Sequence, residues 1–475
     1  MAGRFLQLFK PFSRFMPEVK PPERRVRLGE KLFWTLIALV LYLIMTEVPL
    51  YGIGVGGEDP YLYLRVIFAS HRGSLMELGI QPIVTAGLIL QLLAGSGIIS
   101  FDQSNPEDRT LFTSASKFFS LVLIGIQASA YLIGGVYGTL NFRMTIIIFI
   151  QLLVAGIVLM LLDELIQKGW GIGSGISLFI MAGVAQRILW SSLAPWPPMY
   201  VGQKYFYGAL IAFFQAIING ETLLNALTRP WMPSISMLGF ITTIVVFLFV
   251  IYIEGIKVQI PVAYARYRGF RGRYPIKLLY VSNLPVIFAS ALFANIYLVS
   301  QLLWSRFYPD TPFWVNLLGQ YEYGASGQPE PIGGLVYYVI SPRSISDVAN
   351  DPLRALIFAG IMVSFCIIFS LIWLQVGGQN PSTVARQLVD AGMQIPGFRR
   401  SHKPIEQVLR RYIPVVTVLG GMIVGLISSV ADFFGVFGTG MGVLLSVGIL
   451  YQYYQLLMRE HIEETYPGLR RFLGE

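Results

Sequence analysis

Long apolar runs alternate with short polar segments along the whole chain. A helix needs about 20 consecutive apolar residues to cross the hydrocarbon core of a bilayer. Only 13% of the residues are charged, about half the share that is usual in soluble domains, which indicates a membrane protein. We predict membrane-spanning helices at residues 33–50, 118–140, 144–162, 173–189, 237–256, 278–303, 355–374, 413–430 and 443–457.

A further stretch, residues 73–93, has the pattern of a helix that stops and restarts. The segment before it, 61–72, is apolar but carries charges, and Pro82 suits the first turn of a new helix. About a dozen apolar residues follow Pro82, too few to span a bilayer. A broken helix is tolerated in a membrane only where its free backbone lines a cavity or is covered by protein. We therefore expect this stretch to face a pore or a substrate path, with a kinked packing helix as the alternative.

The distribution of basic residues predicts the topology of these ten helices. Residues 207–219 are apolar but too short to span comfortably, and we predict that they do not cross. With ten helices, 26 of the 35 lysines and arginines fall on one side of the membrane. By the positive-inside rule, that side is cytoplasmic and holds both termini and the loops 257–277 and 375–412.

The two long cytoplasmic loops are rich in arginine. Arg266 and Arg268 flank Tyr267 in the first loop, and Arg399 lies in the second. Arginine next to an aromatic side chain can bind phosphate in a bidentate manner and stack on a base, which fits RNA. On composition alone, contact with anionic lipid is the favoured interpretation.

Two short motifs recur in the two halves of the chain. Residues 82–87 resemble 285–290, and the glycine-rich 171–176 resembles 438–443. Because each half has five helices, the second half enters the membrane from the opposite side, which gives an inverted repeat. The sequence thus predicts an all-α fold of ten helices in two inverted halves, 1–190 and 237–475, joined by an external hinge segment, 191–236.

Branched aliphatic residues lie on or beside these motifs. A ring of such side chains at a constriction excludes water and ions without binding them. For any single residue, plain helix packing is the simpler interpretation. The glycine runs do not fit a nucleotide-binding loop. The predicted ring residues are Ile80, Val84, Ile176, Ile180, Ile287 and Leu445.

At these residues the chain resembles the SecY family, the large subunit of the protein-conducting channel, and is closer to its archaeal and eukaryotic branch. One departure, an extra residue after Gly440, leaves Leu444 as an alternative to Leu445. The resemblance spans nearly the whole chain and is carried by ELGIQPIVTAGLILQLLAGSGII, LLDELIQKGWGIGSGISLFI, ARYRGFRGRYPIKLLYVSNLPVIFASALFANI, GFRRSHKPIEQVLRRYIP and ADFFGVFGTGMGVLLSVGILYQYYQ.

The resemblance implies a function for each of these features. Residues 61–72 match the plug, the aliphatic residues match the pore ring, and the second and seventh helices match the lateral gate, which opens sideways to lipid. The two basic loops match the ribosome-docking loops, which favours ribosomal RNA over lipid as their ligand. The individual residues implied are Thr85, Gln127 and Asn295 at the gate and Arg266, Arg268 and Arg399 in the docking loops.

The resemblance also implies partners and a location. The partners are SecE/gamma-type and beta-type small membrane subunits, the ribosome, signal sequences, nascent chains and membrane lipid. No cofactor is expected. The membrane is the archaeal plasma membrane, with the endoplasmic reticulum as the alternative.

Two other classes of protein fit the sequence less well than a channel does. An ion-coupled transporter would need carboxylates or histidines inside the membrane, but the acidic residues of the apolar runs fall at predicted helix ends. An intramembrane enzyme is disfavoured because the sequence has no HExxH or GxSxG motif. The four acidic residues at predicted helix ends are Asp163, Glu164, Glu254 and Asp432.

Overall fold

The computed structural model describes most of the chain. The described residues are 9, 11, 16–24, 26–53, 70, 71, 73–95, 98, 99, 106–133, 137, 140–195, 205–230, 235–264, 271–280, 284–323, 329–342, 344–390, 392–394 and 402–465.

Within these residues, nine helices are long and apolar enough to cross a membrane. Each corresponds to one predicted apolar run, so the predicted set is confirmed. A π-helical turn, Ile166–Trp170, follows the third of them. The nine helices are α2 (Leu28–Glu47), α5 (Pro106–Ile133), α6 (Phe142–Leu165), α7 (Gly175–Leu193), α10 (Met237–Gly255), α11 (Leu284–Phe307), α15 (Pro352–Val376), α17 (His402–Phe433) and α18 (Gly440–Thr465).

Some helices extend well beyond the apolar run that predicted them. Helix α17 begins at His402, eleven residues before the predicted start, and α5 begins twelve residues early at Pro106. Hydropathy detects only the part of a helix that suits lipid, whereas a polar helix can continue outside it because its core contacts are made with other protein segments. The first turns of α17 pack on the short helix α16 (Pro381–Asp390).

The predicted broken helix, the second of the ten along the chain, is also present. Helix α4 (Gln81–Gly95) has only 15 residues and follows a turn in which Gly79 has a φ of 55°. Pro82 lies in its first turn, as predicted. The apolar run at 207–219, which we predicted not to cross the membrane, forms α8 (Ala209–Ile218). Its 10 residues are too few to span, and the short α9 (Leu223–Thr228) follows it.

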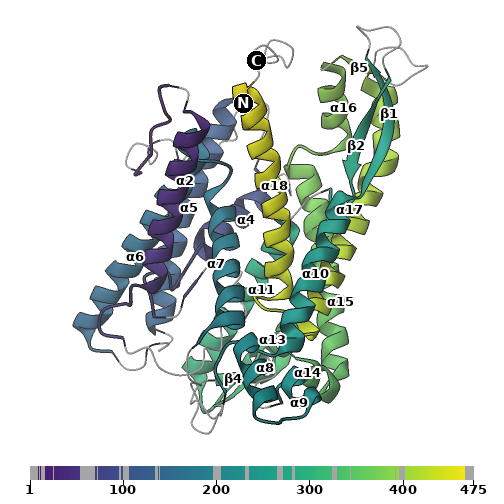
Figure 1. The fold of residues 1–475 in the computed structure, drawn as a ribbon. Helices are drawn as coiled ribbons and strands as arrows, with labels where there is room; N and C mark the ends of the chain where they lie inside the picture. Colours follow the sequence, from purple (N-terminus) through teal and green to yellow (C-terminus); the bar gives the residue numbers. More distant parts are fainter. Residues whose placement is uncertain are drawn as a thin grey trace.

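Two small sheets lie at opposite ends of the helix bundle (Figure 1). Strands β1 (Lys257–Tyr264), β2 (Arg271–Lys277) and β5 (Met393–Gln394) form an antiparallel sheet in the order β2-β1-β5. We call this the sheet end of the molecule. The sequence analysis did not predict either sheet.

The opposite end carries several short elements. They are α8, α9, α12 (Phe313–Leu318), the hairpin β3 (Gln320–Tyr323) and β4 (Pro329–Gly333), α13 (Gly334–Val339) and α14 (Ile345–Asn350). Helix α2 starts and helix α18 finishes at the sheet end (Figure 1). The first spanning helix therefore begins, and the last one ends, on the side of strands β1, β2 and β5.

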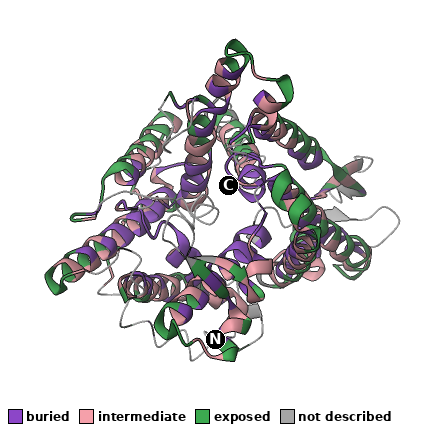
Figure 2. Ribbon diagram, turned by 90° about the horizontal axis from the view of Figure 1, so that it is seen from below, coloured by how far each residue is buried: buried purple, intermediate pink, exposed green. Residues whose placement is uncertain are grey.

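Buried residues lie mostly toward the middle of the bundle and exposed residues toward its outside (Figure 2). The largest buried apolar cluster draws on both halves of the chain. Many exposed side chains on the outer faces are large and apolar, such as Leu356 (73% exposed) and Ile133 (84% exposed). This pattern is that of a bundle whose outer surface is solvated by lipid.

Candidate functional site

All six predicted ring residues belong to, or pack against, one large apolar cluster. Five of them belong to the largest buried cluster, and Ile176 packs against it. Ile80, Ile180 and Leu445 are fully buried, while Val84 and Ile287 are 7% exposed. These side chains come from the turn before α4 and from α4, α7, α11 and α18. Segments more than 300 residues apart in sequence thus supply one aliphatic cluster.

The ring residues form pairs related by the internal repeat. Val84 and Ile287 each lie two residues after the proline that opens α4 or α11. Ile180 and Leu445 are each the sixth residue of their helix, because α7 begins at Gly175 and α18 begins at Gly440. The same count pairs Leu444 with Phe179 and therefore favours Leu445 as the ring residue.

This register corrects the glycine alignment of the sequence analysis, which paired 171 with 438. The glycines with positive φ are Gly173 (75°) and Gly438 (77°), and each lies two residues before its helix. Both motifs have glycine at alternate positions, so a shift of two residues leaves the letters matched. Only the backbone conformation distinguishes the turn glycine from its neighbours.

One residue of this region was missed from the sequence. Met441 is fully buried, and its sulfur lies 2.8 Å from Ser290 Oγ of α11. Ser290 also donates to Val286 O. A small residue at the end of the repeated motif 285–290 is the signal that could have indicated a close helix contact there.

Two of the three predicted gate residues are in direct contact. Asn295 Nδ2 of α11 donates to Thr85 Oγ1 of α4 at 3.2 Å and to Ala291 O at 2.7 Å. Gln127 of α5 is 4% exposed, and its Oε1 has no hydrogen-bond partner within the described part of the chain. The structure therefore joins Thr85 and Asn295, and no hydrogen bond connects Gln127 Oε1 to them.

The three predicted docking arginines, Arg266, Arg268 and Arg399, lie outside the described residues, but the strands that flank them are described. Tyr264 of β1 pairs with Met393 of β5, and Ala263 pairs with Gln394. The two basic loops therefore continue from neighbouring strands of one sheet.

The predicted plug, 61–72, lies outside the described residues except for Ser70 and His71. The Ser70 hydroxyl donates to Glu77 O, and His71 N donates to Met76 O at 3.0 Å. The fully buried Glu77 carboxylate accepts from Gly73 N. The end of the predicted plug is thus tied to the turn from which α4 begins.

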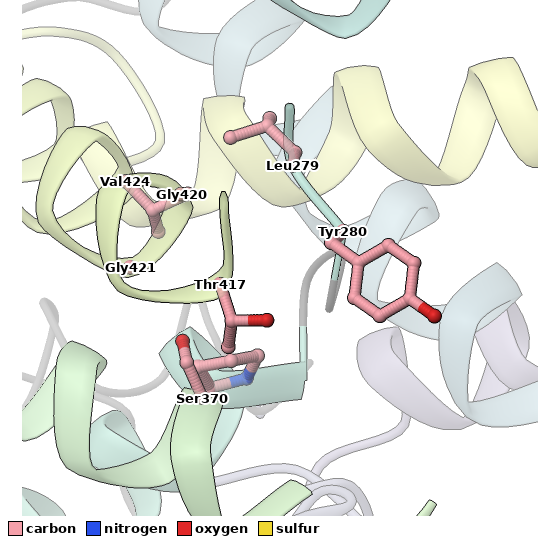
Figure 3. Close-up of a pocket in the computed structure, with 8 residues that line it drawn as sticks. Leu279, Tyr280, Ser370, Thr417, Gly420, Gly421 and Val424 are labelled. Carbon is pink, nitrogen blue, oxygen red and sulfur yellow. The ribbon is translucent and has the colours of Figure 1, made fainter. Parts of the chain in front are cut away.

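A small pocket lies between α15, α17, the start of α11 and the segment just before it (Figure 3). Its empty volume, open solvent included, is about 220 Å³. The hydroxyls of Ser370 and Thr417 donate to backbone carbonyls of their own helices, and Tyr280 donates to Gln379 O. These hydroxyl protons are satisfied within the protein, and we assign no ligand to the pocket.

Comparison with known proteins identifies the family. The SecY family model matches residues 74–454, and the model of the plug domain of Sec61p matches 40–73, a range that contains the predicted plug. The chain is 44% identical to the protein translocase subunit SecY of Pyrococcus furiosus, over 97% of this chain and 98% of that protein. It is 43% identical to the Sec61 subunit alpha of Dictyostelium discoideum, over 98% of each.

Solved structures give the same result. A protein-conducting channel superposes with a TM-score of 0.83 at 38% identity, covering 97% of this chain and 98% of that chain. Sec61 in the canine ribosome-channel complex from the endoplasmic reticulum superposes with a TM-score of 0.80 at 37% identity and the same coverage. With its two inverted five-helix halves and broken second helix, the chain is a multi-pass membrane protein that belongs to the SecY family.

Proposed function

We propose that the chain is the central pore-forming subunit of a protein translocation channel. It passes secretory polypeptides across the membrane and releases transmembrane segments sideways into lipid. The observation that carries this proposal is the single buried cluster to which both halves contribute aliphatic side chains at repeat-related positions. The similarity to SecY and Sec61 proteins over 97% of the chain supports it.

The chemistry of the ring suits a passive path for polypeptides. Branched aliphatic side chains at a constriction disfavour water and ions. They offer no directional hydrogen bond, so they do not retain any particular passing sequence. We assign no catalysed reaction to the chain.

The segment 61–72 acts as the plug that blocks the resting pore. Its connection through Ser70 to Glu77 ties it to the turn before α4. A signal sequence that displaces α4 therefore also acts on the end of the plug.

The lateral gate opens between α4 and α11. The Asn295–Thr85 hydrogen bond links these two helices inside an otherwise apolar contact. Gln127 lies on α5, which packs against α4. It is the third polar residue of the gate, with Thr85 and Asn295, and water reaches it when the gate parts.

The sheet end faces the cytoplasm and receives the ribosome through Arg266, Arg268 and Arg399. The pairing of β1 with β5 supports a single docking surface that combines both loops. Both termini are cytoplasmic, the membrane is an archaeal plasma membrane or the endoplasmic reticulum, and small subunits of the SecE/gamma and beta types complete the channel.

Ribosome binding tests this proposal. The channel complex is reconstituted in vesicles and sedimented with translating ribosomes, as wild type and as Arg268→Glu with Arg399→Glu. Because phosphate contacts release counterions, binding by the wild type should weaken as salt rises. The double variant should bind far more weakly at moderate salt, whereas translocation of a short unfolded substrate after its synthesis should suffer less.

A charge reversal at the other end of the bundle is the control for a general charge effect. Arg306 is exposed in the last turn of α11, at the end of the bundle opposite the sheet, and Arg306→Glu should leave ribosome binding unchanged. Wild-type vesicles that neither retain ribosomes nor import a signal-bearing chain would contradict the proposed function.

A further inference from the structure

The turn that leads into α7 is held by side chains from two other helices. Asp163, near the end of α6, accepts a hydrogen bond from Ile176 N at 2.9 Å. Thr35 of α2 accepts one from Ile172 N at 3.0 Å. Ser174, the N-cap residue of α7, makes no side-chain cap bond. A carboxylate from a neighbouring helix therefore caps α7.

The turn that leads into α18 is held in the same way. Asp432, near the end of α17, accepts from Gly440 N at 2.6 Å. Thr243 of α10 accepts from Phe437 N at 2.9 Å. Thr439 in this turn has a φ of 65°, a left-handed conformation that is strained for a β-branched residue. Such a conformation persists only where the surrounding contacts hold it.

The threonine contacts of the two turns match position by position, whereas the carboxylate accepts from the second residue of α7 and from the first residue of α18. Ile172 and Phe437 each lie three residues before the first residue of their helix. Both threonine hydroxyls donate to the carbonyl four residues earlier in their own helix, which leaves a lone pair for the turn. Helices α2 and α10 are the first of their halves, and α6 and α17 are the fourth. The inverted repeat thus preserves a set of hydrogen bonds as well as a fold.

Close packing reinforces the carboxylate contacts. A Cβ atom on Gly175 would lie 2.6 Å from Asp163 Cα, and one on Gly440 would lie 2.3 Å from Ser428 O. Each helix start is thus pressed against the helix that supplies its carboxylate. No larger residue fits at either position without moving one of the two helices.

The turn before α7 also packs against α18, and the turn before α18 packs against α7. A Cβ on Gly173 would lie 3.0 Å from the ring of Tyr453 in α18, and one on Gly438 would lie 3.1 Å from Val184 and 3.4 Å from Ile188 in α7. Tyr453 and Ile188 occupy the same place, thirteen residues after the start of their helix. Helices α7 and α18 are therefore locked as a reciprocal pair.

We propose that Asp163, Asp432, Thr35 and Thr243 are positioning residues that keep the aliphatic ring in register. Each pair fixes where its helix begins, and the ring residues Ile180 and Leu445 follow five residues later. A slip of one residue would turn these side chains by about 100°. We call Thr35 with Asp163, and Thr243 with Asp432, the two clamps. This inference rests on the proposed function, because the clamps align the ring that the function requires.

The clamps need an acceptor oxygen rather than a charge. A carboxylate in a membrane-spanning helix usually indicates an ion or proton path, but Asp163 and Asp432 each point an oxygen at a backbone N–H. Asparagine offers the same acceptor and is equally good as a helix cap. Asparagine should therefore restore what alanine removes, whereas an ion-handling site would lose its function with either residue.

The test uses the complete channel complex with Asp163→Ala, Asp432→Ala and the two matching asparagine variants. One readout is hydrogen exchange of the backbone amides in residues 171–180 and 436–445. The other is the ion conductance of the idle channel in planar bilayers. We expect each alanine variant to accelerate exchange about fivefold in its own turn, the size expected for loss of a cap, and to raise the idle conductance. Each asparagine variant should match the wild type in both.

Milder variants keep the test decisive if an alanine variant does not fold. Thr35→Val and Thr243→Val remove one acceptor without changing the side-chain shape, and should give smaller changes in the same direction. Thr242→Val is the matched control, because Thr242 is adjacent to Thr243 but its hydroxyl donates only to Leu238 O of its own helix. It should change neither readout.

Three results would overturn the inference. The first is an asparagine variant as leaky as its alanine counterpart, and the second is accelerated exchange without a rise in conductance. The third is unchanged exchange in both alanine variants. A channel with Val84→Gly and Ile287→Gly separates this inference from the proposed function: if it leaks while the clamp variants stay tight, only the positioning role is wrong, and if it stays tight, the ring itself is wrong.

Discussion

Along the contact between α4 and α11, which we call the gate seam, the one side-chain hydrogen bond among the described residues joins Asn295 to Thr85 at 3.2 Å. Along the contact between α7 and α18, which we call the clamp seam, turn glycines from each side pack on the partner helix. Tyr453 also donates to Ser174 O there at 3.0 Å. The gate seam is therefore joined by a single side-chain hydrogen bond, whereas the clamp seam is interlocked by close packing.

This difference assigns a motion to each seam. Water can replace a single hydrogen bond between two side chains at little cost, so the gate seam can part. Glycine packing has no such substitute, because separation would leave empty space on both sides. The clamp seam should stay closed, so that the halves pivot about α7 and α18. The ring takes Val84 and Ile287 from one seam and Ile180 and Leu445 from the other.

The largest expected effect comes from removing ring side chains at the gate seam. Val84→Gly with Ile287→Gly deletes two branched side chains from the buried cluster. Water should enter the constriction, and the idle channel should conduct ions well above the bilayer background while its fold is kept. Single-channel recording in planar bilayers measures this.

Glycines at lipid-facing positions are the matched control for that variant. Leu356 of α15 and Val245 of α10 are 73% and 57% exposed, and replacing both by glycine costs helix stability to a similar extent, about 1 kcal/mol each. Their channel should stay closed. An equal leak from both double variants would mean that helix softening, and not loss of the ring, opens the channel.

The next effect concerns the linker that carries the chain from α7 to α10. Arg229 is 2% exposed and donates to Phe206 O, Tyr207 O and Ile235 O at 2.7–3.0 Å. Burial lowers the pKa of its guanidinium to about 10, so it remains charged at neutral pH. Arg229→Met should lower the free energy of unfolding by roughly 1–3 kcal/mol, since three carbonyls lose their donor.

Thermal unfolding in detergent measures this loss, with the exposed Arg306→Met as the control. If the linker only joins the halves and the clamp seam sets their pivot, the dependence of insertion on signal hydrophobicity should not change. A large shift in that dependence would move the pivot from the clamp seam to the linker.

The sequence predicted those parts of the molecule that depend on local composition. Apolar length located the spanning helices, the position of Pro82 located the start of α4, and the shortness of 207–219 excluded an extra span. Thr85 and Asn295 were expected together through resemblance, and the structure joins them. Their role in gating stays a prediction.

The clamps could not be predicted in this way. Thr35 bonds to a residue 137 positions away and Thr243 to one 194 positions away, and a lone threonine in an apolar helix has no signature that distinguishes a clamp from an ordinary bond to its own backbone. The glycine register was ambiguous because glycine alternates in both motifs. The third strand of the sheet, β5, has only two residues, too few to leave a pattern in the sequence.

A smaller effect is expected at the gate seam. Asn295→Leu, alone or with Gln127→Leu, removes polar groups that water satisfies once the gate has opened, so the closed state should be favoured. Hydrogen bonds between membrane helices contribute only about 0.6 kcal/mol on average, which corresponds to a shift of roughly threefold. Insertion across a graded Leu/Ala series of signal segments should therefore require more leucine, and marginal signals should suffer most.

The control for this variant lies on the same helix. Gln301 of α11 is half-buried, and Gln301→Leu removes an amide near the far end of the helix. It should leave the half-insertion point where it is. A half-insertion point that stays fixed in Asn295→Leu, or that moves toward less hydrophobic signals, would leave Thr85, Gln127 and Asn295 with a packing role only.

The smallest effect distinguishes the turn before α7 from the turn before α18. Lys168, just after α6, pairs with Glu18 of the N-terminal segment and with Glu164 beside the clamp residue Asp163.

The hydrogen bond from Lys168 holds the pKa of Glu18 below its usual value of 4.5. The pair therefore stabilises the folded chain above about pH 4.5, and this contribution is lost as the pH falls toward the lowered pKa. The Glu18 side chain is 59% exposed, so solvent screening keeps the contribution below about 0.5 kcal/mol. Glu18→Gln should accordingly lower the unfolding temperature only slightly at pH 7 and by less at pH 3, and it should speed hydrogen exchange in 171–180 without affecting 436–445. Equal acceleration in both turns would mean that the clamps are coupled through the α7 and α18 pair and do not act separately.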